Sequence, residues 1–414
     1  MAEVQPFRAL HYDRDRVGSL QGVVAPPYDV IDAEQRAELL ARSPHNVVEI
    51  DLPLSEGDPY AHAAAVFEQW RRDGVLVRDE EPALWALAQD YTGPDGQRRT
   101  RQVFFARVKV EDYGPGRIRP HERTHPGPKE DRLRLTRATK ANLSPIFSLY
   151  DDPAGAAWGA LAPHLQAEPW SEVTDEDGTV HRLWRVGDPD AAAAVAAALA
   201  PAELLIADGH HRYETARVYH QEGGAGHVLM CLVALQDPGL TVFPTHRLLT
   251  GLDDSRRESL RATIQRDFEI ATVDADQLEP TGDGPVRMGY LDAHHGRPLM
   301  LTLRDPAIAA AALPDKPEPY RALDTAVLEA LVLEGALGMS EDDISHLNGL
   351  EYARDTAQAR ERVESGAAQA AFFMGATPVQ RVRDVAATGE SMPPKSTYFF
   401  PKVLTGMVFN PLDD

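Results

Sequence analysis

The chain has 414 residues, of which 42 are basic and 64 acidic, so its formal net charge is −22. Such an acidic composition argues against a nucleic-acid interface, because phosphate backbones require a basic protein surface. A hydrophobic content of 43% and a charged content of 26% are those of an ordinary globular protein, and the length allows two or three domains with substantial cores.

The cysteine content and the lack of long apolar runs predict the cellular compartment of the protein. The single cysteine, Cys231, lies in an apolar run that predicts a buried strand, and it has no partner for a disulfide. The first residues contain no apolar signal core, and no run approaches the roughly 18 apolar residues of a membrane span. We therefore expect a cytoplasmic protein with no membrane partner. The sequence leaves open whether the chain forms a homo-oligomer.

Residues 1–150 are predicted to form an N-terminal α+β subdomain. In its motif A-P-P-Y-D-V-I the two prolines break regular structure, which puts Asp29 in an extended turn. This carboxylate either contacts a substrate amine or caps the turn. Short strands are predicted at residues 7–10, 23–25, 83–90 and 102–110, and helices at residues 33–41, 60–73 and 130–139.

A Gly- and Pro-rich loop at residues 114–127 carries the run H-E-R-T-H and is followed by K-E-D-R. Loops of this composition on a rigid scaffold are typical of substrate sites, although a solvated charged loop is the alternative. Lys129 and Arg132 are candidates for phosphate binding, Glu122 for an acid/base or metal-ligand role, and His121 for substrate contact. The flanking prolines argue against a zinc site made by His121 and His125.

The most informative segment lies in the next predicted subdomain, residues 151–250. A strand at 181–186, an alanine-rich helix at 191–200 and a strand at 204–207 lead into the run D-G-H-H-R. A further helix is predicted at residues 213–221. The run therefore lies where a buried strand turns into a helix, a position that favours anion binding.

The residue types of this run indicate phosphate chemistry. Gly209 allows a tight turn, and His210, His211 and Arg212 supply positive charge for a phosphate. Asp208 would repel phosphate, so its presence indicates a magnesium ligand or a base aimed at a hydroxyl. The alternative is an Asp that only caps the helix.

Residues 251–414 are predicted to form a C-terminal α+β subdomain. Just before it, His246 follows F-P-T at a strand end and is a candidate pocket residue. Near the chain end, Lys395 in M-P-P-K-S-T lacks the glycine of a P-loop, yet it remains a candidate for substrate contact. The predicted elements are helices at residues 255–267, 323–333 and 379–389, a hairpin at 286–303 and a strand at 369–374.

The strand–D-G-H-H-R–helix unit resembles the phosphate-binding motif of the ParB/sulfiredoxin fold, and most closely that of its free-serine kinases. The resemblance, which covers about 40 residues, implies that Asp208 is the base for a substrate hydroxyl and that residues 209–212 hold phosphate. Sulfiredoxins have a cysteine where this chain has His210, which argues against their chemistry. The serine kinases also carry a Glu shortly after the first strand of the unit; Asp190 or Glu122 is the candidate to replace it.

Over nearly its whole length the chain resembles the bacterial family catalogued as domain of unknown function 1015. The matching blocks, in chain order, are A-P-P-Y-D-V-I, H-E-R-T-H-P-G-P-K-E-D-R, A-N-L-S-P-I-F, A-D-G-H-H-R-Y-E-T-A, F-P-T-H-R-L-L and M-P-P-K-S-T-Y-F-F-P-K. This resemblance implies a family and a fold but no activity.

The sequence therefore predicts a mixed α/β protein of two or three subdomains with a ParB/sulfiredoxin-like unit near its middle. The leading functional hypothesis is a small-molecule kinase, with free L-serine the first acceptor, Mg²⁺ as cofactor, Asp208 as its ligand, and ATP, ADP or pyrophosphate as phosphoryl donor. The alternatives are a non-catalytic nucleotide- or phosphate-sensing protein and a phosphoesterase that uses the same site.

Overall fold

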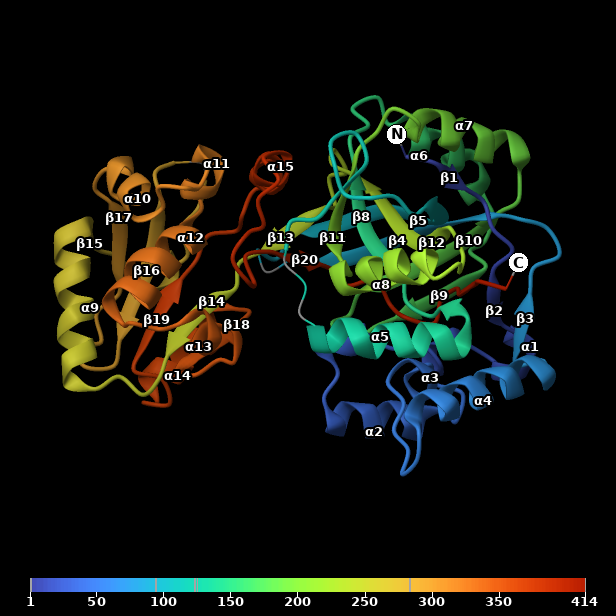
Figure 1. Cartoon of the computed structure of the whole chain (residues 1–414), viewed down its shortest axis with the longest axis horizontal. Coiled ribbons are helices and arrows are strands. Elements are labelled where there is room, and N and C mark those ends of the chain that lie inside the picture. Colours follow the sequence, from blue (N-terminus) through green and yellow to red (C-terminus); the bar gives the residue numbers. More distant parts are fainter. Residues whose placement is uncertain (1, 94, 123, 125, 283, 414) are drawn as a thin grey trace. The chain divides into compact units, whose positions relative to one another are not determined.

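The chain folds into two compact units, which are described separately below (Figure 1). The computed structural model describes residues 2–93, 95–122, 124, 126–282 and 284–413. The first unit contains Met1–Pro120, Thr124–Thr241 and Pro401–Asp414, and the second contains His121–Arg123 and Val242–Phe400. The last residues of the chain, Pro401–Asp414, are called the C-terminal segment from here on, and they belong to the first unit.

A nine-stranded sheet forms the centre of the first unit in the described part of the chain. Its order is β6-β11-β8-β12-β5-β4-β10-β9, with β1 paired to β5, and most neighbours are antiparallel. The strands are β1 (Val4–Gln5), β4 (Leu84–Thr92), β5 (Arg98–Lys109), β6 (Ile118–Arg119), β8 (Ile146–Tyr150), β9 (Ser171–Thr174), β10 (Val180–Val186), β11 (Leu204–Asp208) and β12 (His227–Ala234).

One face of this sheet packs into an apolar core. Phe104, Ile206 and Leu232 point into it, and the helices contribute Val195 and Tyr213. Because side chains alternate along a strand, the neighbouring residues of the same strands lie on the opposite face, and they are also buried. The helices around the sheet are α6 (Ala156–Leu161), α7 (Pro189–Leu199) and α8 (His210–Gln221), and α2 (Ala33–Arg42), α3 (Val48–Asp51), α4 (Pro59–Arg72) and α5 (Pro126–Thr139) (Figure 1).

The C-terminal segment is part of the packing of the first unit. It bridges Ala25 through Thr405 and Leu10 through Phe409, and its strand β21 (Asn410–Pro411) pairs with β7 (Ala141–Asn142). Phe409 is fully buried against the rings of Tyr12 and Phe67. The smaller elements of this unit are α1 (Arg14–Val17) and the paired strands β2 (Leu10–Tyr12) and β3 (Leu76–Arg78).

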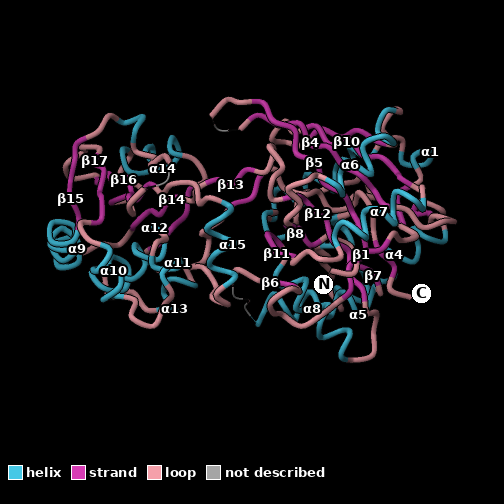
Figure 2. The backbone as a smooth tube through the Cα atoms, turned by 90° about the horizontal axis from the view of Figure 1, so that it is seen from above, coloured by secondary structure: helices cyan, strands magenta, loops and turns pink. Residues whose placement is uncertain are grey.

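The second unit is built on a six-stranded sheet of order β15-β17-β16-β19-β14-β18, and Figure 2 shows β15, β17 and β16 side by side. Its strands are β14 (His246–Leu249), β15 (Phe268–Thr272), β16 (Arg287–Asp292), β17 (Leu299–Leu303), β18 (Leu350–Ala353) and β19 (Ala370–Phe373). Its helices are α9 (Asp254–Asp267), α10 (Pro306–Ala312), α11 (Glu318–Arg321), α12 (Asp324–Leu328), α13 (Glu341–Ser345), α14 (Thr356–Glu364) and α15 (Val379–Ala387). The short strands β13 (Thr241–Phe243) and β20 (Tyr398–Phe400) pair with each other.

The predicted mixed α/β class is confirmed, and so are the predicted strand at 204–207 and the burial of Cys231. Three helices differ from the prediction. The helix predicted to begin at residue 213 begins at His210, because the turn from β11 is made at Gly209 alone. The helix predicted to begin at residue 130 begins at Pro126. The helix expected at 323–333 continues beyond α12 as a π-helix, Glu329–Ala336.

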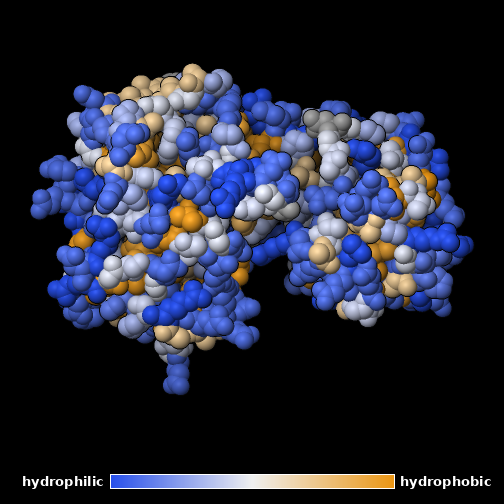
Figure 3. Space-filling view, turned by 180° about the vertical axis from the view of Figure 1, so that it is seen from behind, coloured by the Kyte–Doolittle hydropathy of each residue, from blue (hydrophilic) through white to orange (hydrophobic). Residues whose placement is uncertain are grey.

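Two further observations concern domain boundaries and the surface. The boundary expected near residue 151 falls inside the first unit, after β8, whereas the change of unit near residue 250 occurs at 241–242. No described helix is long and apolar enough to cross a membrane. Polar side chains cover most of the face seen in Figure 3, and the exposed large apolar residues of the described chain are Leu54, Ile270 and Leu347.

Replacing Phe409 by alanine is expected to lower the free energy of unfolding of the first unit by about 3–5 kcal/mol, because it empties a fully buried aromatic site. Urea denaturation measures this loss. The control is Leu54→Ala, at a side chain that is 65% exposed, which should change the free energy of unfolding by less than about 0.5 kcal/mol. Equal effects of the two substitutions would contradict the packing role of the C-terminal segment.

Candidate functional site

The joint between β11 and α8, residues 208–212, has the geometry of an anion site. Gly209 adopts a left-handed conformation with φ of 97°, and a Cβ atom built there would lie 2.9 Å from Nε of Arg212. The backbone conformation therefore favours glycine here, and a larger residue would also displace the side chain of Arg212. Because the N-cap residue is a glycine, it offers no side chain to the first-turn amides of α8. The positive end of the helix is thus directed at this joint.

Asp208 ends β11 and lies between two cations. Its Oδ2 accepts a hydrogen bond from Nζ of Lys402 at 2.7 Å, and its Oδ1 lies 3.4 Å from Nη2 of Arg212. Both Asp208 and Lys402 are four-fifths covered. Burial favours the neutral acid, but Lys402 and Arg212 together outweigh it and hold the pKa of Asp208 well below its usual range. Asp208 is therefore an ionised carboxylate at neutral pH.

Arg212 links this joint to the loop before β8. Its Nη1 donates to the main-chain oxygen of Pro145, and its side chain is 12% exposed. The Nε of Arg212 is buried and has no hydrogen-bond partner in the described part of the chain. Arg212 therefore keeps one donor beyond those that its neighbours in the chain satisfy.

A second buried carboxylate lies near Arg212, on α3. Asp51 accepts from Nη1 of Arg132 at 3.2 Å and from the hydroxyl of Ser144 at 3.0 Å. Burial raises the pKa of Asp51, although Arg132, Ser144 and Arg212 oppose this. The guanidinium of Arg132 also lies over the ring of Tyr28, 4.1 Å from its centre. Arg132 also pairs with Asp131 at 2.7 Å, so two carboxylates balance its charge.

Tyr28 joins the A-P-P-Y-D block to the same cluster. Burial raises its pKa to about 12, while Arg212 and Arg132 favour its ionised form. Asp51, Arg132, Ser144 and Arg212 line a cavity of about 30 Å³, enough for about one water molecule. Four sequence blocks that were noted separately therefore meet at one place in the first unit.

The remaining predicted residues of the first unit lie as follows. His210 is buried, His211 is half-buried, and Asp29 is exposed next to Tyr28. Lys129 is half-buried on α5, and its main-chain oxygen accepts from the hydroxyl of Thr215 on α8 at 3.3 Å. The phosphate contacts of His210, His211 and Lys129 and the substrate contact of Asp29 stay predictions.

Four predicted residues belong to the second unit, so their participation with Asp208 stays a prediction. Burial lowers the pKa of His246 to about 4, and its Nδ1 accepts from the amide of Met374. His121 is also buried, with Nε2 at 2.9 Å from the hydroxyl of Thr397. Glu122 is half-buried and Lys395 is exposed. Arg123 and His125 of the H-E-R-T-H run lie outside the described residues.

The sequence analysis missed Lys402 and Asp51. Lys402 belongs to the block M-P-P-K-S-T-Y-F-F-P-K, whose other lysine was chosen because it precedes Ser-Thr. The apolar residues before Lys402 were the available signal, since they predict a buried segment that carries the lysine inward.

The described residues do not fit the predicted magnesium site. They contain no group of three or more His, Cys, Asp or Glu side chains that could hold a metal ion. Both oxygens of Asp208 are engaged by cations, Lys402 and Arg212, which compete with a metal for the carboxylate. No step proposed below depends on magnesium.

A family model confirms the resemblance noted in the sequence. The model described as "Protein of unknown function (DUF1015)" matches residues 4–326. The chain belongs to this family. No curated protein matches the DUF1015 chain in a sequence search.

Solved structures with a similar fold include a free serine kinase in complex with AMP, with a TM-score of 0.40 and 14% identity over 73% of this chain and 92% of that chain. A conserved hypothetical protein from Pyrococcus furiosus has a TM-score of 0.37 and 14% identity, over 73% of this chain and 95% of its own. SbnI from Staphylococcus aureus, truncated at its C-terminus, has a TM-score of 0.37 and 12% identity, over 75% of this chain and 90% of its own.

Replacing Lys402 by methionine is expected to raise the pKa of Asp208. Burial favours the neutral acid, and of the two cations Arg212 alone would then oppose this effect. Carboxyl ¹³C NMR measures this pKa, with Asp208→Asn to assign the resonance. The Lys402→Arg variant keeps a cation and should keep the pKa low. An unchanged titration of Asp208 in Lys402→Met would contradict the pairing.

The same pair predicts the sign of a pH effect on stability. Because the pKa of Asp208 is lower in the folded protein than the usual value of about 3.9, the pair stabilises the fold fully above that value. This contribution is lost as the pH falls through the lower, folded pKa. Urea denaturation at several pH values should therefore show the penalty of Asp208→Asn shrinking as the solution becomes strongly acidic.

Proposed function

We propose that this DUF1015 protein is a phosphotransferase that moves a phosphoryl group to the hydroxyl of a small molecule, with free L-serine the first acceptor to test. One observation carries the proposal: an ionised carboxylate, Asp208, is held by Lys402 and Arg212 at the N-terminus of α8. Phosphoryl transfer depends on positioning and on neutralising the charge of the phosphate, with a carboxylate to take the proton of the acceptor.

The proposed roles follow from the contacts of these groups. The phosphate of a donor, either a nucleotide such as ATP or ADP or pyrophosphate, is bound by the first-turn amides of α8 and by Arg212. It also competes with Asp208 for the ammonium of Lys402. That competition frees a carboxylate oxygen of Asp208 for the acceptor hydroxyl.

The transfer step balances without a further reactant. A bond forms between the acceptor oxygen and phosphorus, and the bond from phosphorus to the leaving oxygen of the donor breaks. The hydroxyl proton passes to Asp208, which the phosphate has partly released from Lys402. The two cations offset the charge of the departing phosphate.

A nucleotide- or phosphate-sensing role is the second candidate function. It is favoured by the fact that both oxygens of Asp208 already contact cations of the chain, so the carboxylate completes the fold without a substrate. In that role the anion is bound by the joint at residues 208–212 and is not transferred. Binding without turnover distinguishes it from the phosphotransferase.

Phosphorus NMR of the purified protein with each donor and a pool of amino acids and small alcohols tests the proposal. We expect a new phosphomonoester signal that requires the acceptor, and a rate about 10²- to 10⁴-fold lower in Asp208→Asn, because the proton acceptor is lost. The control is Asp112→Asn, at a carboxylate that is 71% exposed and pairs with Arg217, which should keep the full rate.

Each contrary outcome has a definite meaning. A full rate in Asp208→Asn would reject the proposed base. Donors that stay intact while they raise the melting temperature would favour the sensor. Release of inorganic phosphate that needs no acceptor would indicate a phosphoesterase.

A further inference from the structure

A buried arginine on the sheet of the first unit pairs with no carboxylate in the described part of the chain. Arg101, on β5, is fully buried, and its guanidinium lies over the ring of Phe147, 4.6 Å from its centre. Burial lowers its pKa to about 10, so it is still charged at neutral pH. A buried charge without a counter-ion is costly, and it needs strong hydrogen-bond acceptors.

Two oxygens serve as those acceptors. The Oε1 of Gln89, on the neighbouring strand β4, accepts from Nε and Nη2 of Arg101 at 2.9 and 2.6 Å. The main-chain oxygen of Pro401 accepts from Nη2 as well. The first belongs to the sheet and the second to the C-terminal segment, so Arg101 ties the two together.

Gln89 also contacts the next residue of the C-terminal segment, Lys402. Because its Oε1 faces Arg101, its Nε2 is directed the other way, where it donates to the main-chain oxygen of Lys402 at 3.1 Å. The same Nε2 lies 3.2 Å from Nδ1 of His181, on β10. An amide nitrogen only donates, so Nδ1 of His181 is the acceptor and the ring carries its proton on Nε2. That Nε2 is 2.8 Å from Oδ2 of Asp175.

Arg101, Gln89, His181 and Asp175 therefore form one hydrogen-bonded chain, called the Arg101 network here. Its members Arg101 and Gln89 donate hydrogen bonds to the main-chain oxygens of two successive residues, Pro401 and Lys402 respectively. The side chain of the same Lys402 reaches Asp208 at 2.7 Å.

We propose that Arg101 and Gln89 are positioning residues for Lys402. They fix the main chain at residues 401–402 so that the ammonium of Lys402 meets Asp208, while His181 and Asp175 fix the orientation of Gln89. The first three members of the network are fully buried, whereas the Asp175 side chain is 13% exposed. The network therefore runs from the sheet interior to the surface.

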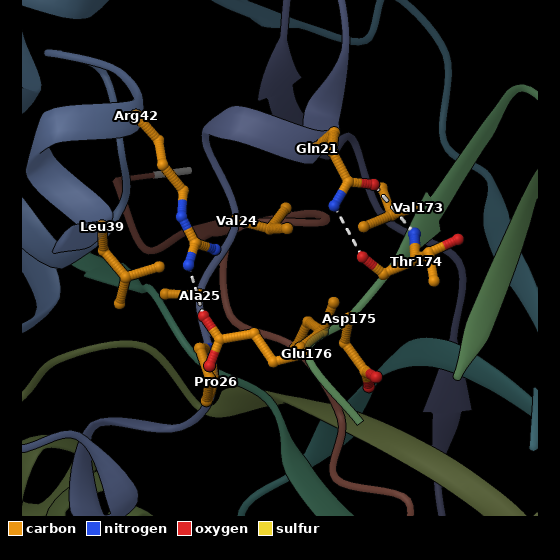
Figure 4. Close-up of a pocket in the computed structure, with 11 residues that line it drawn as sticks. Gln21, Val24, Ala25, Pro26, Leu39, Arg42, Val173, Thr174, Asp175 and Glu176 are labelled. Carbon is orange, nitrogen blue, oxygen red and sulfur yellow. Dashed lines mark hydrogen bonds and ion pairs between the residues drawn. The ribbon is translucent and has the colours of Figure 1, made fainter. Parts of the chain in front are cut away.

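At its outer end, Asp175 borders a hollow of about 140 Å³ within the first unit. Leu404 of the C-terminal segment and Pro26 of the A-P-P-Y-D block also line it, and Figure 4 shows the ion pair between Arg42 and Glu176 closing one side. Solvent thus reaches the network at Asp175, at the end away from Asp208.

The test uses Gln89→Glu in the full-length protein. Glutamate has the same shape and still accepts from Arg101, but it cannot donate to the carbonyl of Lys402. The readout is the rate at which acetic anhydride labels Lys402, followed against pH by peptide mass spectrometry. We expect about fivefold faster labelling of Lys402, the change that loss of one such hydrogen bond produces, and a lower apparent pKa of its ammonium.

A matched control is Arg182→Gln on β10. Arg182 directly follows His181 in sequence but pairs with Asp90, and both side chains are 36% exposed. This variant should leave the labelling of Lys402 unchanged. Lys109, at 48% exposure, is the internal reference in every variant.

Labelling of Lys402 at the wild-type rate in both Gln89→Glu and Arg101→Lys would overturn the proposal. So would a rise in the labelling of Lys402 that Arg182→Gln reproduces, because Arg182 lies outside the Arg101 network. Because no substrate is present, this experiment stands apart from the proposed phosphoryl transfer, whose failure would leave its outcome unchanged.

Discussion

The ion pair between Asp208 and Lys402 is the contact on which the first unit's candidate site depends. Its partners are 194 positions apart in sequence, one at the end of β11 and the other in the C-terminal segment. Alone, the covered carboxylate of Asp208 would be driven toward its neutral form, and with Lys402 and Arg212 it stays ionised. The pair therefore links the C-terminal segment to the joint at residues 208–212 and keeps the carboxylate of Asp208 charged.

The cluster around this pair concentrates charged groups of both signs. The chain carries a net charge of −22, and the described cluster contains four cations, Lys402, Arg212, Arg132 and Arg101, together with the carboxylates Asp208, Asp51, Asp131 and Asp175. Asp208 and Asp51 are in opposite environments, since cations lower the pKa of Asp208 and burial raises that of Asp51. Such divergence is typical of sites that separate the roles of two acids.

The sequence was sufficient to predict the local structure of the joint but not its long-range partners. The apolar run of β11, the turn at Gly209 and the nearby Arg212 are properties of one short segment, which local patterns describe well. Lys402 and Asp51 come from distant segments, so local patterns do not show that either residue lies next to the joint.

The Arg101 network is a second set of long-range contacts that local sequence patterns do not predict. The residues two positions from Gln89, Arg101 and His181 include Leu87, Val103 and Leu183, so the pattern indicates buried strand faces but not the acceptors that satisfy the polar groups. Those acceptors include main-chain oxygens of the C-terminal segment, and no local pattern contains that information. The substrate role suggested by the chemical character of His246 stays a prediction, and its buried ring accepts a hydrogen bond from the amide of Met374.

Amide ¹⁵N NMR of the labelled protein during a titration with inorganic phosphate, and then with ADP, tests the central claim most directly. The account predicts that the amide signals of residues 209–212 shift with both ligands, and that these shifts weaken in Lys402→Met. Ligand-induced shifts elsewhere in the chain, with the signals of residues 209–212 unmoved, would contradict it.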